Sequence, residues 1–358
     1  MERILFVKLS ALGDIIQSLG ALHFVIKQVP NCKIDWVVEE PFAHLLLACP
    51  YIHRVIICNT KKWRRERPTK EIVQWICSLR KISYDMVIDL QGNCKSGLVT
   101  FFAKAKAKHG FDSSSVSEWP NLFFTRYHYS VSKDISIQKQ YVCLVEQIIG
   151  KQEKIEKSSH SFFLLSIQEK IKLEFYKKHI LQKKYKNVFM ICFSSRWENK
   201  RLDPHFVLSF LQYLRKPLAS QYLFIWKEEQ EKKEAIWYVN ELGNQDISLG
   251  DLSIPLWHAI MQEIDLVISM DSSSLHLAAL TSTPTYAFFG PSKASIYNPI
   301  GANHGYYQGS CPHSINFTKR CPLLRKCVDG GCLKQITLRE TVDHFLDWWY
   351  KVISKKII

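Results

Sequence analysis

The 358-residue chain has no long hydrophobic run, and this narrows the classes of protein to which it can belong. No apolar stretch approaches the roughly 18 residues that a membrane-spanning helix needs. The opening residues, MERILFVKLSALGD, contain only a short apolar segment and no small-residue cleavage site. We therefore expect a first β-strand there and not a signal peptide. Internal repeats and low-complexity tracts are also missing, so a globular protein is expected.

Signatures of several other classes are absent. The turn after the first predicted strand has no G-x-G-x-x-G, so it gives no support for a dinucleotide cofactor. No helix-turn-helix, RNA-recognition or zinc-finger pattern is present, which disfavours a nucleic-acid-binding protein. Acidic residues are scarce, 33 against 48 Lys and Arg, and the formal charge is +15. This excess favours a partner with phosphates or carboxylates, such as a nucleic acid, an anionic membrane surface or an anionic substrate.

The chain has eleven cysteines, and most of them stand singly inside apolar runs, as reduced thiols of a cytosolic protein do. Four others cluster near the C-terminus: Cys311, Cys321, Cys327 and Cys332. Their spacing includes no C-x-x-C, so a zinc site has weak support, and cytosolic disulfides are not expected. We favour a reduced structural loop, and we expect no metal and no cofactor.

Short β-branched and aromatic runs alternate with segments of helical period, the pattern of parallel β-α-β units. Strands are predicted at Ile4–Leu9, Lys33–Glu39, Arg54–Cys58, Asp85–Leu90, Lys108–Phe111, Val188–Phe193, Tyr222–Trp226, Leu266–Met270 and Thr285–Phe289. Helices are predicted at Ile15–Val29, Thr69–Lys81, Lys95–Lys106, Pro204–Leu214, Glu228–Leu242, Ile254–Glu263, Ser273–Leu280 and from Leu338 onward.

The polar, charged segment from Gly150 to His160 is a plausible linker. The sequence thus predicts an α/β protein of two Rossmann-like domains, residues 1–160 and 161–358, which face each other across a ligand-binding cleft. The last helix could pack back on the first domain.

Lys8-Leu9-Ser10-Ala11-Leu12-Gly13-Asp14 follows the first strand. Gly13 would permit a tight turn into the first helix. Asp14 could cap the free amides of that helix, or it could act as a general base whose pKa is lowered by nearby Lys8. The residues alone leave both interpretations open.

Two polar segments of the second half also follow strands. Ser194, Ser195 and Lys200 precede a helix that Pro204 opens, which suits a phosphate-binding turn, although an ordinary solvated loop would look similar. Asp271 and the free amides of 272–274 open an apolar helix and would suit a pyrophosphate or a ribose. The alternative is a plain helix cap with His276 in the core.

In this order the segments resemble the lipopolysaccharide heptosyltransferases, glycosyltransferase family 9, and within it the type I branch. The resembling motifs run from Phe6 to Ser292: FVKLSALGD, DWVVEEPFA, KKWRR, YDMVIDLQGNCKSGL, KHGFD, SSRWENK, VISMDSSSLHLAAL and FFGPS. The resemblance implies the GT-B fold and an inverting, metal-independent transfer of L-glycero-D-manno-heptose from ADP-heptose to a Kdo residue of Kdo-lipid A.

The resemblance also assigns roles to residues. Asp14 would be the catalytic base. Donor-binding residues would be Lys8, Ser194, Ser195, Lys200, Glu231 (with Glu229 as a rival), Asp271, Ser272, Ser273 and His276. Acceptor-binding residues would be Ser10, Gly13 and the basic loop of Lys61, Lys62, Arg64 and Arg65, with Trp63 against sugar or lipid. As bare sequence, such a charged run is more often a solvated face.

The chain departs from the type I pattern at Ser273, where glycine is usual, and at Ser117, where arginine is usual and Arg126 is a candidate replacement. A related enzyme with another donor sugar or a later core acceptor therefore stays open, as does a nucleotide-sugar epimerase of the same architecture. We expect a monomer on the cytoplasmic side, peripherally associated with the inner membrane.

Overall fold

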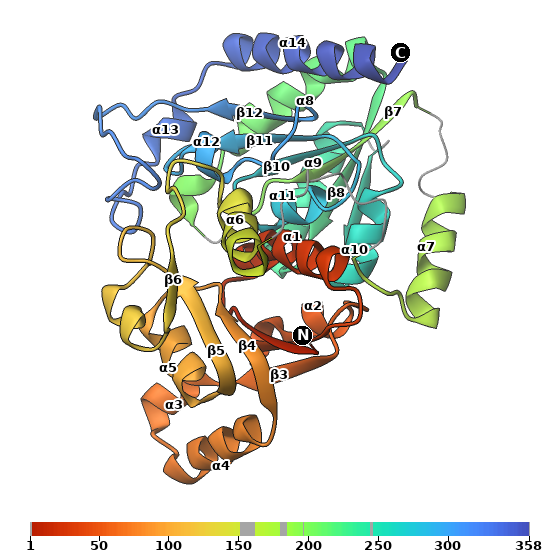
Figure 1. The fold of residues 1–358 in the computed structure, drawn as a ribbon. Helices are drawn as coiled ribbons and strands as arrows, with labels where there is room; N and C mark the ends of the chain where they lie inside the picture. The colour runs from red at the N-terminus through yellow and green to blue at the C-terminus, as the bar shows by residue number, and fades with distance from the viewer. Residues whose placement is uncertain (1, 151–161, 180–184, 196, 244–245, 358) are drawn as a thin grey trace. The chain divides into compact units, whose positions relative to one another are not determined.

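The computed structural model describes residues 2–150, 162–179, 185–195, 197–243 and 246–357, with side chains to residue 352. It divides into two compact units, Met1–Leu164 and Leu165–Ile358, which are described separately (Figure 1). The predicted linker lies outside the described residues, except for Gly150.

The first unit is built on a six-stranded parallel sheet in the order β3-β2-β1-β4-β5-β6. Its strands are β1 Arg3–Val7, β2 Lys33–Glu39, β3 Arg54–Cys58, β4 Ser83–Asp89, β5 Lys104–Phe111 and β6 Tyr127–Tyr129. Its α-helices are α1 Leu12–Gln28, α2 Ala43–Leu47, α3 Thr60–Glu66, α4 Thr69–Arg80, α5 Cys94–Phe102 and α6 Ile137–Ile149, with 3₁₀ turns η1 Glu40–Phe42 and η2 Trp119–Phe123.

The second unit repeats this plan with the order β12-β11-β10-β7-β8-β9. Its strands are β7 Asn187–Cys192, β8 Ser220–Trp226, β9 Ile247–Gly250, β10 Leu266–Met270, β11 Thr285–Phe289 and β12 His304–Gln308. Its helices are α7 Ile167–His179, η3 Glu198–Lys200, α8 Pro204–Leu218, α9 Glu229–Glu241, α10 Ile254–Met261, α11 Ser273–Ala278, α12 Ala294–Tyr297, α13 Gly331–Lys334 and α14 Leu338–Ile357.

In both sheets the strand order reverses beside the first strand of the unit, as it does in Rossmann folds. The reversal lies between β1 and β4 in the first unit, and between β7 and β10 in the second. Ligands of such sheets bind at this switch point, outside the carboxyl ends of the strands. The prediction of two Rossmann-like halves is confirmed.

The strands of the second unit show why a parallel sheet forms there. Every residue of β7, β10 and β11 is buried, because helices cover both faces and leave no solvated side. Phe210 of α8 meets Phe345 of α14 edge-to-face at 5.6 Å between ring centres. Helix α14 therefore packs on its own unit, across α8.

Two sequence predictions for the first unit are wrong in detail. The helix predicted over Lys95–Lys106 ends at Phe102, and β5 begins already at Lys104. Lysine and alanine alternate over 104–108, which is the two-residue period of a strand. The run KKWRR, predicted as a loop, is helical and forms most of α3.

No helix within the described ranges combines the length and the apolar character needed to cross a bilayer.

Candidate functional site

The turn that leads to Asp14 is held by the neighbouring strand at the switch point. The side-chain oxygen of Gln91 accepts hydrogen bonds from the amides of Leu9 (2.7 Å) and Ser10 (3.1 Å). Gln91 is itself fixed by Asp89, which accepts from the amides of Gln91 and Gly92 at 2.9 Å each. Asp89 is fully buried, and burial raises the pKa of its carboxyl group although these hydrogen bonds oppose the shift. The predicted acceptor residue Ser10 thus lies in a rigid turn.

Asp14 lies in the first turn of α1 and is half-buried. Its carboxylate accepts a hydrogen bond from the amide of Ala11 at 3.2 Å, so the capping role is confirmed. Gly13 lies in the first turn of α1 and not in the loop before it. The expectation that Gly13 permits a tight turn between strand and helix is therefore wrong. The backbone at Gly13 is that of an ordinary helix.

Lys8, the first residue after β1, is only 4% exposed. Its ammonium donates a hydrogen bond to the hydroxyl of Tyr141 at 2.7 Å and lies 4.7 Å from the centre of that ring. Tyr141 comes from α6, a helix that the sequence analysis did not predict. The position of the ammonium is therefore set by a helix more than a hundred residues away in the chain.

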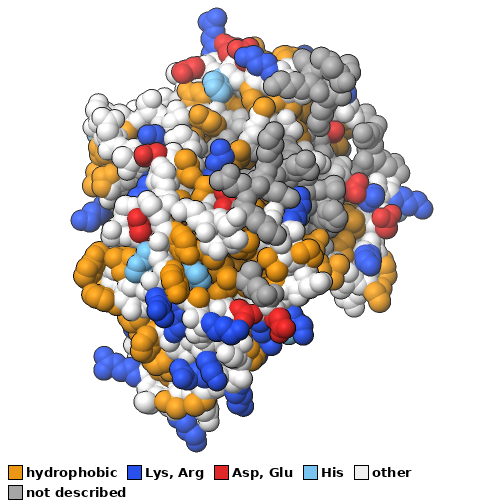
Figure 2. Space-filling model, in the orientation of Figure 1, with side chains coloured by type: hydrophobic (Ala, Val, Ile, Leu, Met, Phe, Trp, Pro, Cys, Tyr) orange, Lys and Arg blue, Asp and Glu red, His pale blue; other side chains and the backbone are white. Residues whose placement is uncertain are grey.

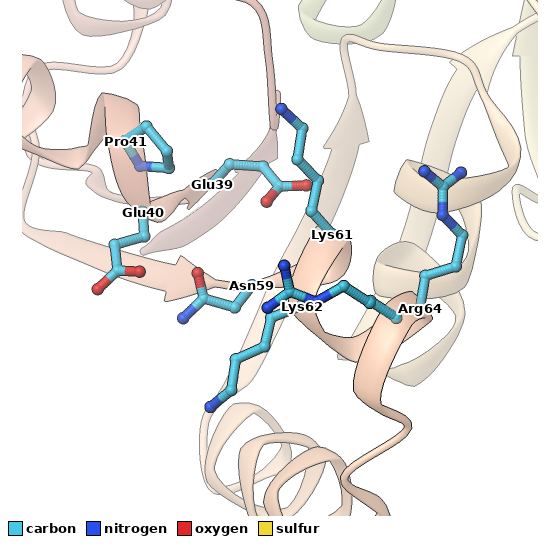
Figure 3. Close-up of a pocket in the computed structure, with 8 residues that line it drawn as sticks. Glu39, Glu40, Pro41, Asn59, Lys61, Lys62 and Arg64 are labelled. Carbon is cyan, nitrogen blue, oxygen red and sulfur yellow. The ribbon is translucent and has the colours of Figure 1, made fainter.

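The basic run forms one wall of a pocket of about 560 Å³ (Figure 3). Its lining residues are Glu39, Glu40, Pro41, Asn59, Lys61, Lys62, Arg64 and Arg65. In Figure 3, Lys61, Lys62 and Arg64 fan out from α3 in different directions, with Glu39 and Glu40 on the other side. The lining carries four cations against two carboxylates.

The four cations of α3 are exposed, but they are not equivalent. Lys62 pairs with Glu71 at 2.7 Å, and Arg65 pairs with its neighbour Glu66. Among the residues that the structure describes, no carboxylate pairs with Lys61 or Arg64. These two cations are the best placed to receive an anionic ligand.

Trp63 anchors α3. It is half-buried, meets Trp75 edge-to-face at 5.1 Å and donates its indole N–H to Glu71 at 2.9 Å. The ring packs on the core of its own unit and is partly exposed, so its contact with sugar or lipid stays a prediction.

In the second unit, the predicted donor residues follow β7, β8 and β10, which are adjacent in the sheet. Lys200, at the end of η3, lies with its ammonium 2.5 Å from the carboxylate of Asp271, which follows β10. Both side chains are 10% exposed. Burial acts to raise the pKa of Asp271, but the charges of Lys200 and His276 outweigh it and hold that pKa below its usual value. Two segments that the sequence analysis treated separately are thus one ion pair at the switch point.

A cluster of serines continues from this pair into α11. The hydroxyl of Ser274 lies 2.6 Å from that of Ser272 and 2.8 Å from that of Ser269. Ser273 begins α11 and is half-buried, and His276 is buried in the same helix. Ser269 was not predicted, and Ser274 was predicted only through its backbone amide.

The loop after β7 holds Ser194 and Ser195, both half-buried. The hydroxyl of Ser195 accepts from the amide of Trp197 at 3.3 Å. Position 196 lies outside the described residues.

Glu231 also serves as a helix cap. It accepts from the amides of Lys227 (2.8 Å) and Glu228 (3.1 Å) at the start of α9. Burial raises the pKa of the Cys192 thiol and the charge of Glu231 adds to that rise, which places Glu231 near the end of β7. Its rival Glu229 pairs with Lys232 at 3.6 Å instead.

The four C-terminal cysteines line one small pocket together with His313, and all four are free thiols. Burial and the charges of the other three cysteines raise the pKa of Cys332 to about 11. Within the described part of the chain, which includes this cluster, no group of three or more His, Cys, Asp or Glu side chains could hold a metal ion.

This cysteine segment supports the donor side of the site. Asn199, next to Lys200, donates its side-chain N–H to the carbonyls of Leu324 (2.6 Å) and Cys327 (3.3 Å). Gly330 has φ +59°, and a Cβ there would lie 2.9 Å from the Cα of Asn199. The cysteine segment therefore packs closely against η3.

Several residues that shape the site were missed in the sequence. Asp89 ends β4 and Gln91 lies just after it within YDMVIDLQGN, so polar residues at a strand end were the available signal. Asn199 lies inside SSRWENK but points to a partner more than a hundred residues away. Nothing in the local sequence singles out Tyr141.

Comparison with known proteins gives a consistent result. A sequence model of glycosyltransferase family 9 (heptosyltransferase) matches residues 72–326. Lipopolysaccharide heptosyltransferase 1 of Campylobacter coli is 28% identical over 297 residues, which are 80% of this chain and 84% of the relative. The enzyme of the same name from Escherichia coli K12 is 36% identical over 143 residues, 38% of this chain and 44% of the relative.

Solved structures agree on the fold. The E. coli heptosyltransferase WaaC with ADP superimposes with a TM-score of 0.76 at 20% identity, over 97% of this chain and 99% of that one. A family 9 glycosyl transferase from Veillonella parvula gives 0.76 at 18% identity, over 98% of each chain. Both matches span the two units, so the predicted GT-B fold class is confirmed.

Proposed function

Because the chain belongs to glycosyltransferase family 9, the heptosyltransferases, we propose that it transfers L-glycero-D-manno-heptose from ADP-heptose to a Kdo residue of Kdo-lipid A. The observation that carries this proposal is the Lys200–Asp271 pair at the switch point of the second unit. It offers a cation for a pyrophosphate and a carboxylate for sugar hydroxyls at one place. The relatives named lipopolysaccharide heptosyltransferase 1 support the choice of donor and pathway.

On the donor side, the pyrophosphate binds Lys200. The His276 ring and the hydroxyls of three serines lie close to the phosphates: Ser194, Ser195 and Ser272. Asp271, released from Lys200, accepts hydrogen bonds from the heptose hydroxyls, beside Ser273. Glu231 binds the ribose with the carboxylate that caps α9. Fixed cations and helix amides stabilise the charge that grows on the leaving ADP, so no metal ion is required.

In the chemical step, the acceptor oxygen bonds to the anomeric carbon as the bond from that carbon to the phosphate oxygen breaks, and the configuration inverts. Asp14 takes the proton of the attacking hydroxyl. An ionised aspartate is a weak base near pH 7, so proton transfer is late and coupled to the departure of ADP. Hydrogen bonds from Ala11 to Asp14 and from Leu9 to Gln91 hold this turn in place. Lys8, hydrogen-bonded to Tyr141, supplies a positive charge for the donor phosphates.

On the acceptor side, Lys61 and Arg64 meet the Kdo carboxylate and the lipid A phosphates, with Lys62 and Arg65 adding to the local positive potential. Ser10 and Gly13 lie at the reacting sugar. The enzyme works as a monomer at the cytoplasmic face of the inner membrane, with peripheral attachment and no nucleic-acid partner.

The test is direct. Purified protein is incubated with ADP-heptose and Kdo-lipid A, and the product is weighed by mass spectrometry; the gain of one heptose is expected. Parallel reactions with ADP-hexoses and with an acceptor that already carries a heptose test the related enzymes left open by Ser273. ADP released equally well without acceptor would favour hydrolysis or epimerisation and overturn transfer.

A further inference from the structure

Segment η2 of the first unit exposes large apolar side chains and buries a polar one. Trp119 and Phe123, at its two ends, are 61% and 71% exposed, whereas Asn121 between them is fully buried. The side-chain NH₂ of Asn121 donates to the carboxylate of Asp89 at 2.7 Å and to the carbonyl of Asn93 at 2.9 Å. Large apolar side chains in water around a buried polar one are unusual and mark an interaction surface.

The outward direction of these rings is fixed by the fold. Glu118, just before η2, accepts from the amide of Cys94 at 2.8 Å. A Cβ at Gly97 of α5 would lie 2.4 Å from the ring of Phe124 and 3.0 Å from the Asn121 side chain. Segment η2 is therefore packed tightly against α5 through Asn121 and Phe124, while Trp119 and Phe123 stay exposed.

Helix α5 extends the exposed apolar surface. Leu98 and Phe101 are one helical turn apart and are 48% and 53% exposed, and the Trp119 and Phe123 rings meet edge-to-face at 5.1 Å. We call Leu98, Phe101, Trp119 and Phe123 the aromatic patch. Figure 2 shows hydrophobic side chains at the left of the view, where Figure 1 places the segment between β5 and β6, with Lys and Arg gathered below them.

Cations border the aromatic patch. The ammonium of Lys108 lies 5.6 Å from the centre of the Phe101 ring and donates to the carbonyl of Phe101 at 2.6 Å. The guanidinium of exposed Arg126 lies 5.6 Å from the Tyr127 ring, and Tyr127 is 42% exposed. This combination of apolar rings with flanking positive charge matches the boundary between lipid tails and anionic head groups.

Helix α5, which carries part of the aromatic patch, begins beside the predicted acceptor helix α3. Glu39 accepts from the hydroxyl of Thr60, the first residue of α3, and its carboxylate lies 3.6 Å from the ammonium of Lys95 in the first turn of α5. The amino ends of α3 and α5 therefore meet at one carboxylate. The predicted acceptor cations thus belong to a helix that starts at the same carboxylate as α5.

We propose that the aromatic patch docks the chain on an anionic lipid surface, with Trp119 and Phe123 inserted at the head-group boundary and Lys108 and Arg126 against the head groups. This inference rests on the proposed function, because a lipid-linked acceptor requires the enzyme to work at a membrane. A second copy of the chain is a poorer occupant, since two patches bordered by cations, on chains of formal charge +15, repel each other.

The test uses vesicles of phosphatidylglycerol and phosphatidylethanolamine and measures the bound fraction by flotation. The full-length double variant Trp119→Ser, Phe123→Ser should bind about tenfold or more weakly than wild type, because two inserted rings are lost. A matched control, Tyr213→Ser with Ile236→Ser, removes side chains of the second unit that are 59% and 44% exposed and should bind as wild type does. Vesicles of phosphatidylcholine alone should bind wild type less.

The same proteins are assayed with a deacylated, water-soluble Kdo acceptor. Both double variants should keep wild-type transfer rates, since neither touches the site. If wild type binds vesicles but transfers no heptose, the proposed function is wrong and the docking surface is still supported. Unchanged vesicle binding of the Trp119/Phe123 variant would overturn the inference. The inference would also be overturned if wild type sediments as a dimer without lipid and the Trp119/Phe123 variant sediments as a monomer.

Discussion

The carboxylate of Asp14 accepts a hydrogen bond from the amide of Ala11, so the residue proposed as the base also caps the helix on which it stands. The bond fixes one carboxylate oxygen relative to the backbone. A base held in this way loses little conformational freedom at the transition state. The two roles can be separated by the choice of substitution.

Asp14→Asn keeps an oxygen that can accept from Ala11, whereas Asp14→Ala does not. Both variants should lose transfer almost completely and keep ADP affinity within a few-fold of wild type. The free energy of unfolding should fall by about 1 kcal/mol in the alanine variant only. Turnover and urea denaturation are measured together. Near-normal turnover of Asp14→Asn would remove Asp14 as the base.

Lys200→Ala should raise the donor KM and lower kcat, with a combined loss of roughly 2–4 kcal/mol, because the leaving pyrophosphate loses its cation. The variant also leaves Asp271 unpaired in a site that is only 10% exposed. Its stability should therefore fall more than that of a Lys200→Ala, Asp271→Asn double variant. Neither magnesium nor EDTA should change the wild-type rate by much; strict dependence on a divalent ion would contradict the mechanism.

Arg64→Ala with Arg65→Ala should raise the acceptor KM strongly and leave the donor KM nearly unchanged. The wild-type acceptor KM should climb with salt more steeply than that of the variant, since screening weakens charge attraction. Lys104→Ala with Lys106→Ala is the matched control: it removes two exposed charges at the amino end of β5, away from the site. Equal effects in the two variants would show that net charge alone matters.

Asn199→Asp removes the donor that holds the carbonyls of Leu324 and Cys327. We expect a rise of about three- to tenfold in the ADP dissociation constant, because Lys200 is the next residue, and a stability loss of about 1–3 kcal/mol. Asn298→Asp removes a similar bond, 2.8 Å to the carbonyl of His304. If calorimetry shows the same loss of ADP affinity in both variants, the cysteine segment does not position Lys200.

Two histidines predict how stability depends on pH. Burial lowers the pKa of both His109 and His258 to about 4, from 6.5 in an unfolded chain. Between these values the unfolded chain binds more protons, so stability is full above pH 6.5 and falls as the pH drops toward 4. The loss between pH 7 and pH 5 should reach up to about 2 kcal/mol for each histidine. His258→Gln should flatten this slope in urea unfolding; an unchanged slope would refute the assignment.

The sequence was most informative where one local pattern decides the structure. The strands at Lys33–Glu39 and Arg54–Cys58 were predicted at their observed bounds, since short runs rich in valine and isoleucine are typical of strands. Helix α6 was missed, and with it Tyr141. The start of β5 was predicted too late, because alternating lysine and alanine fit a helix as well as a strand.

The candidate site was predictable as a set of strand-end segments but not as a set of contacts. Lys200 and Asp271 are 71 residues apart, and only the sheet order brings them together. The same holds for Gln91 with Ser10 and for Asn199 with Leu324, since tertiary partners leave no trace in the local pattern.

The Lys200–Asp271 pair also bears on product inhibition. In the proposed scheme, intact donor replaces both halves of the pair at once, with phosphate on Lys200 and sugar hydroxyls on Asp271. Spent ADP can satisfy only Lys200 and deprives the nearly buried carboxylate of Asp271 of its lysine partner. Breaking the ion pair therefore costs more free energy when ADP binds than when intact donor binds. The empty site thus discriminates between substrate and product by their chemistry at a single contact, and it favours turnover when ADP accumulates.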